Sequence, residues 1–192
     1  IALGIMDSVT GSHKLSYKFF PVVMTIFLFV WLSNLVEIVP GLGTIGIWEV
    51  EEGKRILIPF IRSSSADLNV TLAIALVSVI STQVLGIATL GFFKYAGKFL
   101  VAPWKQPYII GTFVGLLELV AEVAKIVSFS FRLFGNIFAG EVLLIVMLFL
   151  VPYIVPLPFL FLEIFVGLIQ AVVFSMLTLV FMKMAVTDHT AH

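Results

Sequence analysis

The sequence predicts an all-α membrane protein, because the chain is far too apolar for a soluble domain. Of its 192 residues, 61% are hydrophobic and 11% are charged, whereas soluble domains are about 45–50% apolar and about 25% charged. Long apolar stretches recur along the chain, and several reach the length of about 20 residues that a helix needs to span a bilayer. The formal net charge is zero, so no overall positive field would attract nucleic acid.

The first half of the chain predicts two membrane-spanning helices on either side of a polar loop. Residues 1–18 are mixed in polarity and are expected to form an amphipathic segment at the cytoplasmic surface. The apolar run at residues 19–39 is the first expected span, and residues 68–93 form the second. Asp67 is placed to cap the second helix, because its carboxylate can accept hydrogen bonds from free backbone N–H groups.

The distribution of basic residues predicts the orientation of these spans. Lysines gather before the first span and after the second: Lys14, Lys18, Lys94, Lys98 and Lys105. Basic residues concentrate in cytoplasmic loops, so both regions are expected in the cytoplasm and the acid-containing 40–67 loop outside. We therefore expect a multi-pass protein of the inner (plasma) membrane with a cytoplasmic C-terminus. The chain begins at Ile1 without an initiator Met, so its natural N-terminus is expected to lie upstream.

The second half contains an apolar segment that is too long for one upright span. No proline interrupts residues 108–150, and a continuous helix over these residues would measure about 64 Å. The hydrocarbon core is about 30 Å thick, so the segment is either two helices or one helix steeply tilted in the membrane. Pro152, Pro156 and Pro158 then force a break, and a second apolar arm returns at residues 159–185.

A set of polar residues lies on one face of the 108–150 segment: Glu118, Glu122, Lys125, Arg132 and Asn136. At about 100° per residue they fall within roughly 80° of one another. A charge in a membrane helix costs at least about 2.5–3.5 kcal/mol, so this polar face needs a partner, a water path or both. Glu122 could pair with Lys125 or share a proton with Glu118. Arg132 has no acid three or four residues away and always keeps its charge, so its anion must come from outside its own helix.

Further polar residues lie outside this face. Ser128 sits at its border, and Glu141 points toward a different neighbour. On the returning arm, Glu163 and Gln170 are spaced so that they share one helix face. Ionisable side chains inside a membrane are functional candidates by default.

Three stretches of the chain resemble a known family. The run "FRLFGNIFAGE", residues 131–141, is similar to a signature of subunit a, the membrane-embedded stator subunit of F-type rotary ATP synthase. "PFIRSSSADLNVTLAIAL", residues 59–76, resembles a second signature, and "MDSVTGSHKLSYKFFPVVMTIFLFVWLSNLVEIVPG" resembles the family's first matched stretch. The resemblance covers nearly the whole chain in order. The family's N-terminal transmembrane helix is expected to be absent.

The resemblance implies a proton-translocating stator subunit. In the family, a ring of c subunits with one membrane carboxylate each rotates past subunit a, and subunit b forms the peripheral stalk. Protons enter and leave through two offset half-channels. The last two helices form a hairpin that lies nearly along the membrane against the ring, which would make residues 108–150 one tilted helix. The family's essential arginine falls on Arg132, with Asn136 beside it, and Arg132 would separate the half-channels.

The resemblance also assigns polar residues to each half-channel. The outer half-channel would include Glu141, Glu163, Gln170, Asp67 and Asn69. The cytoplasmic half-channel would include Glu118, Glu122 and Ser128. Many members carry His at the position of Glu163, so here Glu141 and Glu163 could form a carboxylate pair that shares a proton. Small residues on the arginine helix suit close approach to the ring: Gly135, Ala139 and Gly140.

Other functions are less consistent with the sequence. The chain has no Gly-rich phosphate loop of the G-x-x-x-x-G-K-[ST] type, so it is not expected to bind nucleotide or to be an enzyme on its own. No cofactor is expected; cysteine is absent, and three scattered histidines make no metal site. The alternatives are a Na⁺-translocating version of the same subunit, a secondary ion-coupled transporter, and a structural scaffold. Inverted repeats would favour the transporter, and the sequence shows none; the intramembrane arginine argues against a scaffold.

Overall fold

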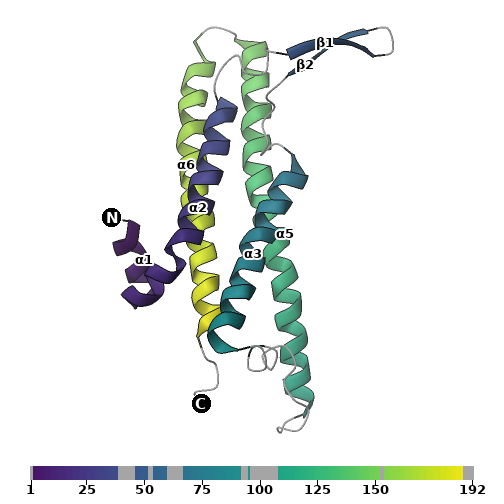
Figure 1. The fold of residues 1–192 in the computed structure, drawn as a ribbon. Helices are drawn as coiled ribbons and strands as arrows, with labels where there is room; N and C mark the ends of the chain where they lie inside the picture. The colour runs from purple at the N-terminus through teal and green to yellow at the C-terminus, as the bar shows by residue number, and fades with distance from the viewer. Residues whose placement is uncertain are drawn as a thin grey trace.

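The computed structural model describes residues 2–38, 46–51, 54–59, 67–91, 95, 108–151 and 154–187. In chain order the elements are α1 (Ala2–Thr10), α2 (His13–Ile38), β1 (Gly46–Glu51), β2 (Lys54–Pro59), α3 (Leu68–Leu90), α5 (Tyr108–Leu150) and α6 (Pro156–Val186). The long helices α2, α3, α5 and α6 lie side by side, and α1 flanks the bundle (Figure 1). Each of these four helices is long and apolar enough to cross a membrane, which confirms the expected class of helical membrane protein.

The structure contains a small β-hairpin that the sequence analysis did not predict. Strands β1 and β2 pair antiparallel, with Gly46 opposite Pro59 and Glu51 opposite Lys54. The hairpin lies at the end of the bundle where α2 ends and α6 begins (Figure 1). Both strands are rich in β-branched and large apolar residues, and the sequence between them is Glu52-Gly53, a turn-forming pair. The acidic and basic residues of this loop concealed that pattern.

Two glycines with positive φ end helices of the bundle. Gly11, with a φ of 71°, follows α1, and its N–H bonds to the Asp7 carbonyl at 2.8 Å. Gly91, with a φ of 83°, follows α3, and its N–H bonds to the Ile87 carbonyl at 2.9 Å. Glycine adopts this left-handed conformation without the steric penalty of a side chain. Helix α3 therefore ends at Leu90, short of the expected boundary at residue 93.

Prolines set the boundaries of the last two helices. Helix α5 runs unbroken over 43 residues and ends at Leu150, because the residue before Pro152 is disfavoured in the helical conformation. The choice left open by the sequence is thus resolved in favour of one continuous helix. Helix α6 begins at Pro156 and not at residue 159, because proline fits the first turn of a helix, where its missing N–H has no partner to lose.

The start of each remaining span has an identifiable cause. Asp67 is the N-cap of α3, and its carboxylate accepts a hydrogen bond from the Asn69 N–H at 2.9 Å, as expected. Helix α2 begins at His13 and not at the apolar run from residue 19. The additional turns carry His13, Lys14 and Lys18 ahead of the apolar stretch, so polar residues form the entry to the span.

The main core lies where α2, α3, α5 and α6 meet. Its buried members are Ile26, Val30, Ile74, Ala75, Phe129, Leu133, Ile137, Ala171 and Phe174. The rings of Phe129 and Phe174 pack with centroids 4.7 Å apart, which fixes the middle of α5 against the middle of α6. Arg132 follows Phe129 by one helical turn, so this packing also fixes the position of the charged residue.

The two ends of the chain pack against each other. On α1, Met6 is buried against Phe19 and against Leu179 and Met182 of α6. The Lys183 ammonium donates a hydrogen bond to the Val9 carbonyl at 2.9 Å. A cation is favourable there because the carbonyls at a helix C-terminus lack intrahelical partners. The start of α2 and the end of α6 therefore lie at the same end of the bundle.

Candidate functional site

Arg132 is exposed on α5 although it lies in the middle of an apolar helix. No hydrogen bond or ion pair joins it to any other residue in the described ranges. Its guanidinium cannot lose its proton at any working pH, so a location inside a membrane requires an anion in contact with it. The sequence analysis expected that anion to come from outside the helix of Arg132, and the described part of the chain does not supply it.

One turn beyond Arg132, a polar contact links α5 to α6. The Asn136 amide donates to the Gln170 Oε1 across 3.4 Å, and Gln170 is 7% exposed. The structure therefore brings together two residues that the sequence placed on separate arms. This contact lies on the side of Arg132 that leads toward the α5–α6 turn.

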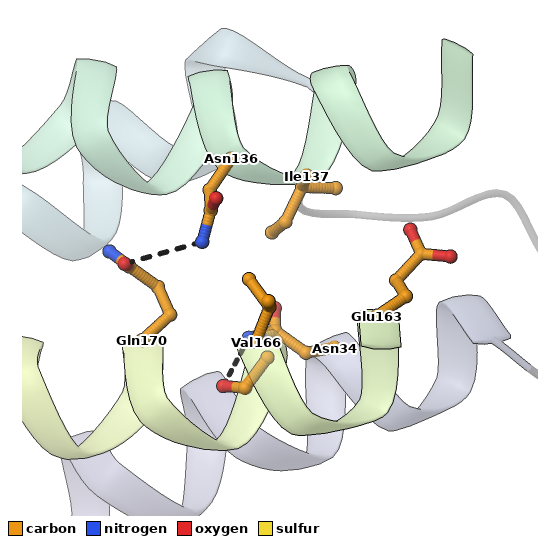
Figure 2. A pocket seen from close by; sticks show the side chains of 7 residues that line it. Asn34, Asn136, Ile137, Glu163, Val166 and Gln170 are labelled. Atoms are coloured by element: carbon orange, nitrogen blue, oxygen red, sulfur yellow. Dashed lines mark hydrogen bonds between the residues drawn. The ribbon is translucent and has the colours of Figure 1, made fainter. Parts of the chain in front are cut away.

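A small cavity lined by both polar and apolar residues adjoins this contact (Figure 2). Its volume is about 20 Å³, and it is lined by Asn34, Asn136, Ile137, Glu163, Val166, Gly167 and Gln170. Three buried polar atoms of the lining have no hydrogen-bond partner among the described residues: Asn34 Oδ1, Glu163 Oε2 and Gln170 Nε2. A water needs about 10–15 Å³ and two to four polar partners. The cavity therefore has the size and the lining of a site for one water molecule.

Asn34 is the lining residue whose role the sequence analysis did not assign. It lies on α2, is 4% exposed, and donates from Nδ2 to the Gly167 carbonyl at 3.1 Å. A Cβ at Gly167 would lie 3.2 Å from the Asn34 Cβ, so glycine permits this close approach of α2 to α6. The available signal was an uncharged polar residue inside an apolar span, but its partner on α6 cannot be read from the sequence.

The resemblance described above implies that this cavity belongs to an ion path, so Asn34→Leu is expected to reduce ion conduction several-fold. The substitution removes the hydrogen bond to Gly167 and replaces one polar wall of the cavity with an apolar side chain, which would no longer hold a water. Conduction can be measured in vesicles from which the soluble catalytic part of the complex has been stripped. Thr25→Val is the matched control, because Thr25 is exposed on the same helix and bonds only to the Pro21 carbonyl of its own helix. Equal conduction by both variants would contradict a role for Asn34.

Glu163 crosses from α6 to α5 and packs on Gly140. A Cβ at Gly140 would overlap the Glu163 Oε1 atom and lie 3.1 Å from its carboxyl carbon. Glu141, the next residue, interacts electrostatically with Glu163. The structure thus brings the two expected outer acids near each other. The sequence analysis expected Gly140 to allow close approach to a ring of other subunits. In the structure, Gly140 instead allows close approach to α6 of the same chain.

A second polar cluster lies toward the start of α5. Lys125 Nζ is 2.6 Å from Glu122 Oε1, the pairing considered from the sequence, and it lies 4.7 Å from the centre of the Phe181 ring. The Tyr95 hydroxyl donates to Gln83 Oε1 of α3. Burial, and then the charges of Glu122 and Glu118, raise the pKa of Tyr95 to about 12. Glu118, Glu122 and Tyr95 therefore share one electrostatic environment.

The remaining predicted site residues lie apart from both clusters. Asp67 and Asn69 are exposed at the start of α3, and Ser128 is exposed on α5, where it ends a shallow groove lined by apolar residues. One turn into α3, the Thr71 hydroxyl lies 3.4 Å from the Ser130 hydroxyl of α5. The start of α3 is thereby held beside the α5 segment that precedes Arg132. Among the residues that the structure describes, no hydrogen bond or ion pair joins Asp67 or Asn69 to the lining of the cavity.

These features define an integral membrane protein with polar groups and a fixed cation along an intramembrane helix. The chain matches the family model for the ATP synthase A chain over residues 1–183. It is 34% identical over 187 residues to the ATP synthase subunit a of Campylobacter jejuni subsp. jejuni serotype O:23/36 (strain 81-176), covering 95% of this chain and 70% of that protein. It is 34% identical over 192 residues to the ATP synthase subunit a of Helicobacter pylori (strain Shi470), covering 99% and 74%. The chain belongs to the family of ATP synthase subunit a, the ion-translocating stator subunit of the F0 sector.

Proposed function

We propose that the chain carries protons through two offset half-channels to and from the carboxylates of a ring of c subunits, with Arg132 between the half-channels. The proposal rests on Arg132, which is exposed and makes no hydrogen bond or ion pair with the residues that the structure describes. One polar cluster lies on each side of it along α5. The missing anion is a ring carboxylate that passes Arg132 during rotation. A nearby fixed cation favours the deprotonated form of that carboxylate, and it also repels protons that would leak directly between the half-channels.

The outer half-channel runs through the cavity between α2, α5 and α6. Glu141 and Glu163 share a proton as a pair, and Asn34, Gln170 and Asn136 orient the water that connects Glu163 with the ring. A water in this cavity could pass a proton to or from the Glu163 carboxylate. Asp67 and Asn69 form the outer mouth of this path.

The cytoplasmic half-channel runs along the first part of α5. Glu118 and Glu122 accept and release the proton, and Ser128 lies between them and Arg132. Along the helix axis Glu118 is about 21 Å from Arg132, and Glu141 is about 13 Å from it on the other side. Water must therefore enter from both faces of the membrane to reach these acids.

Helix α5 is steeply tilted and presents a face to the ring. A continuous helix of 43 residues is about 64 Å long, roughly twice the thickness of the hydrocarbon core. Only 11% of its most apolar stretch is buried within the chain, against 28%, 39% and 33% for the spans of α2, α3 and α6. The exposed face of α5 is covered by the c-ring, while subunit b and lipid cover other parts of the bundle.

The orientation follows from charge and from the contact between the chain ends. Lys183 on α6 bonds to Val9 of α1, so the C-terminal end of α6 lies on the same side of the membrane as Lys14 and Lys18. Basic flanks favour the cytoplasm, which supports a cytoplasmic C-terminus and an outer position for the β-hairpin. The described helices form a single domain of the inner membrane that moves ions, while nucleotide is bound by other subunits.

Single cysteines test the two-channel arrangement in a chain that has none of its own. Glu141→Cys and Glu163→Cys are expected to react with a small polar thiol reagent added from outside, because each replaces an acid of the outer half-channel. Glu118→Cys is expected to react from the cytoplasm. Labelling is measured in the assembled complex, in right-side-out and inverted vesicles.

Phe131→Cys is the control for this experiment. Phe131 is 58% exposed on the isolated chain, but it lies on the apolar surface of α5 beside Arg132, where lipid or the ring excludes a polar reagent. It is expected to react from neither side. Labelling of Glu118→Cys only from outside would overturn both the orientation and the assignment of the half-channels.

A further inference from the structure

We propose that Lys125 is a positioning residue of the cytoplasmic half-channel: it holds one oxygen of the Glu122 carboxylate and leaves the other oxygen open to the proton. The inference rests on the proposed function of Glu122 as an acid of that path. The sequence predicts only that the two side chains could pair, and it does not show which atom of the acid stays free.

Glu122 is the last acid before Arg132 on the cytoplasmic side of α5. No Asp or Glu lies between positions 122 and 132. Along the helix axis Glu122 is about 15 Å from Arg132, against about 21 Å for Glu118. On the proposed path Glu122 is therefore the acid nearest the ring, so its orientation affects the proton transfer that precedes the ring carboxylate.

The ammonium of Lys125 is held from two helices. Its Nζ is 2.6 Å from Glu122 Oε1 and 4.7 Å from the centre of the Phe181 ring of α6. The Phe181 ring packs against that of Phe129 with centroids 5.6 Å apart, and Phe129 belongs to the buried core. A cation is attracted to the face of an aromatic ring. The flexible lysine side chain is thereby fixed between an acid on α5 and a ring on α6.

The two oxygens of Glu122 have different surroundings. Oε1 accepts the hydrogen bond from Lys125, whereas Oε2 is buried and has no hydrogen-bond partner in the described part of the chain. A buried acceptor without a partner costs free energy, so Oε2 is the atom at which a water or a proton is most favourable. When Oε2 binds the proton, Oε1 remains an acceptor for Lys125. The contact therefore persists while the carboxylate is loaded and unloaded.

Two substitutions at Lys125 test this role. Lys125→Met removes the donor to Oε1, so proton conduction should fall about fivefold, because the carboxylate is no longer held in one geometry for transfer. Lys125→Arg keeps a cation that can donate to Oε1 and lie against Phe181, so it should retain at least about half of the wild-type rate. Conduction is measured in vesicles that contain the complete membrane sector, normalised to the amount of assembled complex.

Two further variants make the outcome decisive. Lys14→Met is the control, because Lys14 is an exposed lysine on α2 outside the proposed path, and it should conduct as the wild type does. Lys125→Met added to Glu122→Gln should cause no further loss, because Lys125 acts through that acid. Wild-type conduction by Lys125→Met, an equal loss in Lys125→Arg, a further loss in the double variant, or a change confined to the amount of complex would each overturn the inference.

The proposed function of Glu122 is tested separately. Glu122→Gln alone should reduce conduction, because the amide cannot take up and release the proton. Wild-type conduction by that variant would refute the place of Glu122 in the cytoplasmic path. A loss in Glu122→Gln together with wild-type conduction by Lys125→Met would refute only the positioning role of Lys125.

Discussion

ATP synthesis driven by an imposed proton gradient is expected to fall to background when Arg132 is replaced by lysine, although the substitution keeps a positive charge. Arg132 is exposed and makes no hydrogen bond or ion pair with the residues that the structure describes. It lies one turn from Phe129, whose ring packs against Phe174. Its delocalised guanidinium keeps its proton in an apolar environment, and its planar fork can hold a carboxylate in two hydrogen bonds. A lysine ammonium is a compact point charge that loses its proton readily when it is desolvated. The barrier between the half-channels would then fail.

The measurement is ATP synthesis in energised vesicles, with immunoblots to show that the variant complex contains its c-ring. Lys18→Arg is a suitable control, because Lys18 is an exposed basic residue on α2 outside the proposed path, and it should retain wild-type synthesis. Assembled Arg132→Lys complexes that synthesise ATP and pump protons at near-normal rates would exclude the role assigned to Arg132.

Gly140→Ala is expected to cause the second largest loss, through the position of Glu163. The added methyl group would overlap the Glu163 carboxylate, which must then leave its site beside Glu141 and the cavity. Alanine favours a helix over glycine by about 1 kcal/mol, so weakening of α5 would not explain a defect. Proton conduction through the membrane sector should fall by at least about tenfold, which corresponds to about 1.4 kcal/mol in the transport barrier.

A compensating change makes the Gly140 prediction specific. Glu163→Asp shortens the acid by one methylene group and moves its carboxylate away from α5. In the double variant Gly140→Ala with Glu163→Asp the overlap is relieved, so conduction should recover in part relative to Gly140→Ala alone. Wild-type conduction by Gly140→Ala, or equal loss in the single and double variants, would show that the packing of Glu163 on Gly140 does not control the path.

The helices could be predicted from the sequence because their signals are local. The absence of proline from residues 108–150 fixed the bounds of α5, but length alone left one helix or two as alternatives, since both satisfy the backbone hydrogen bonds. The sequence predicts the start of α6 three residues late, because Pro156 and Pro158 indicate a helix break, although proline is tolerated in the first turn. The β-hairpin was not predicted, because the acidic and basic residues between positions 49 and 55 are typical of a solvated loop.

The charged site residues could be predicted for a different reason. A charge inside an apolar run is expensive whatever surrounds it, so Arg132, Glu141 and Glu163 stand out without knowledge of the fold. Asn34 and Tyr95 do not stand out, because the role of a neutral polar side chain depends on the residues that it contacts. Those partners are Gly167 on α6 and Gln83 with Gly86 on α3. Only tertiary packing brings these groups together.

The hydrogen bond from Lys183 to Val9 joins residues 174 positions apart, and this has a consequence for biogenesis. Helix α1 is synthesised before α6, so its docking surface on α6, with Leu179 and Met182, does not yet exist when α1 leaves the ribosome. Asn34 of α2 likewise cannot form its hydrogen bond until Gly167 has been synthesised. Helices α1 and α2 therefore lack these contacts until α6 has been synthesised. Insertion of α6 then brings Glu163 and Gln170 to Asn34 and forms the cavity that these residues line.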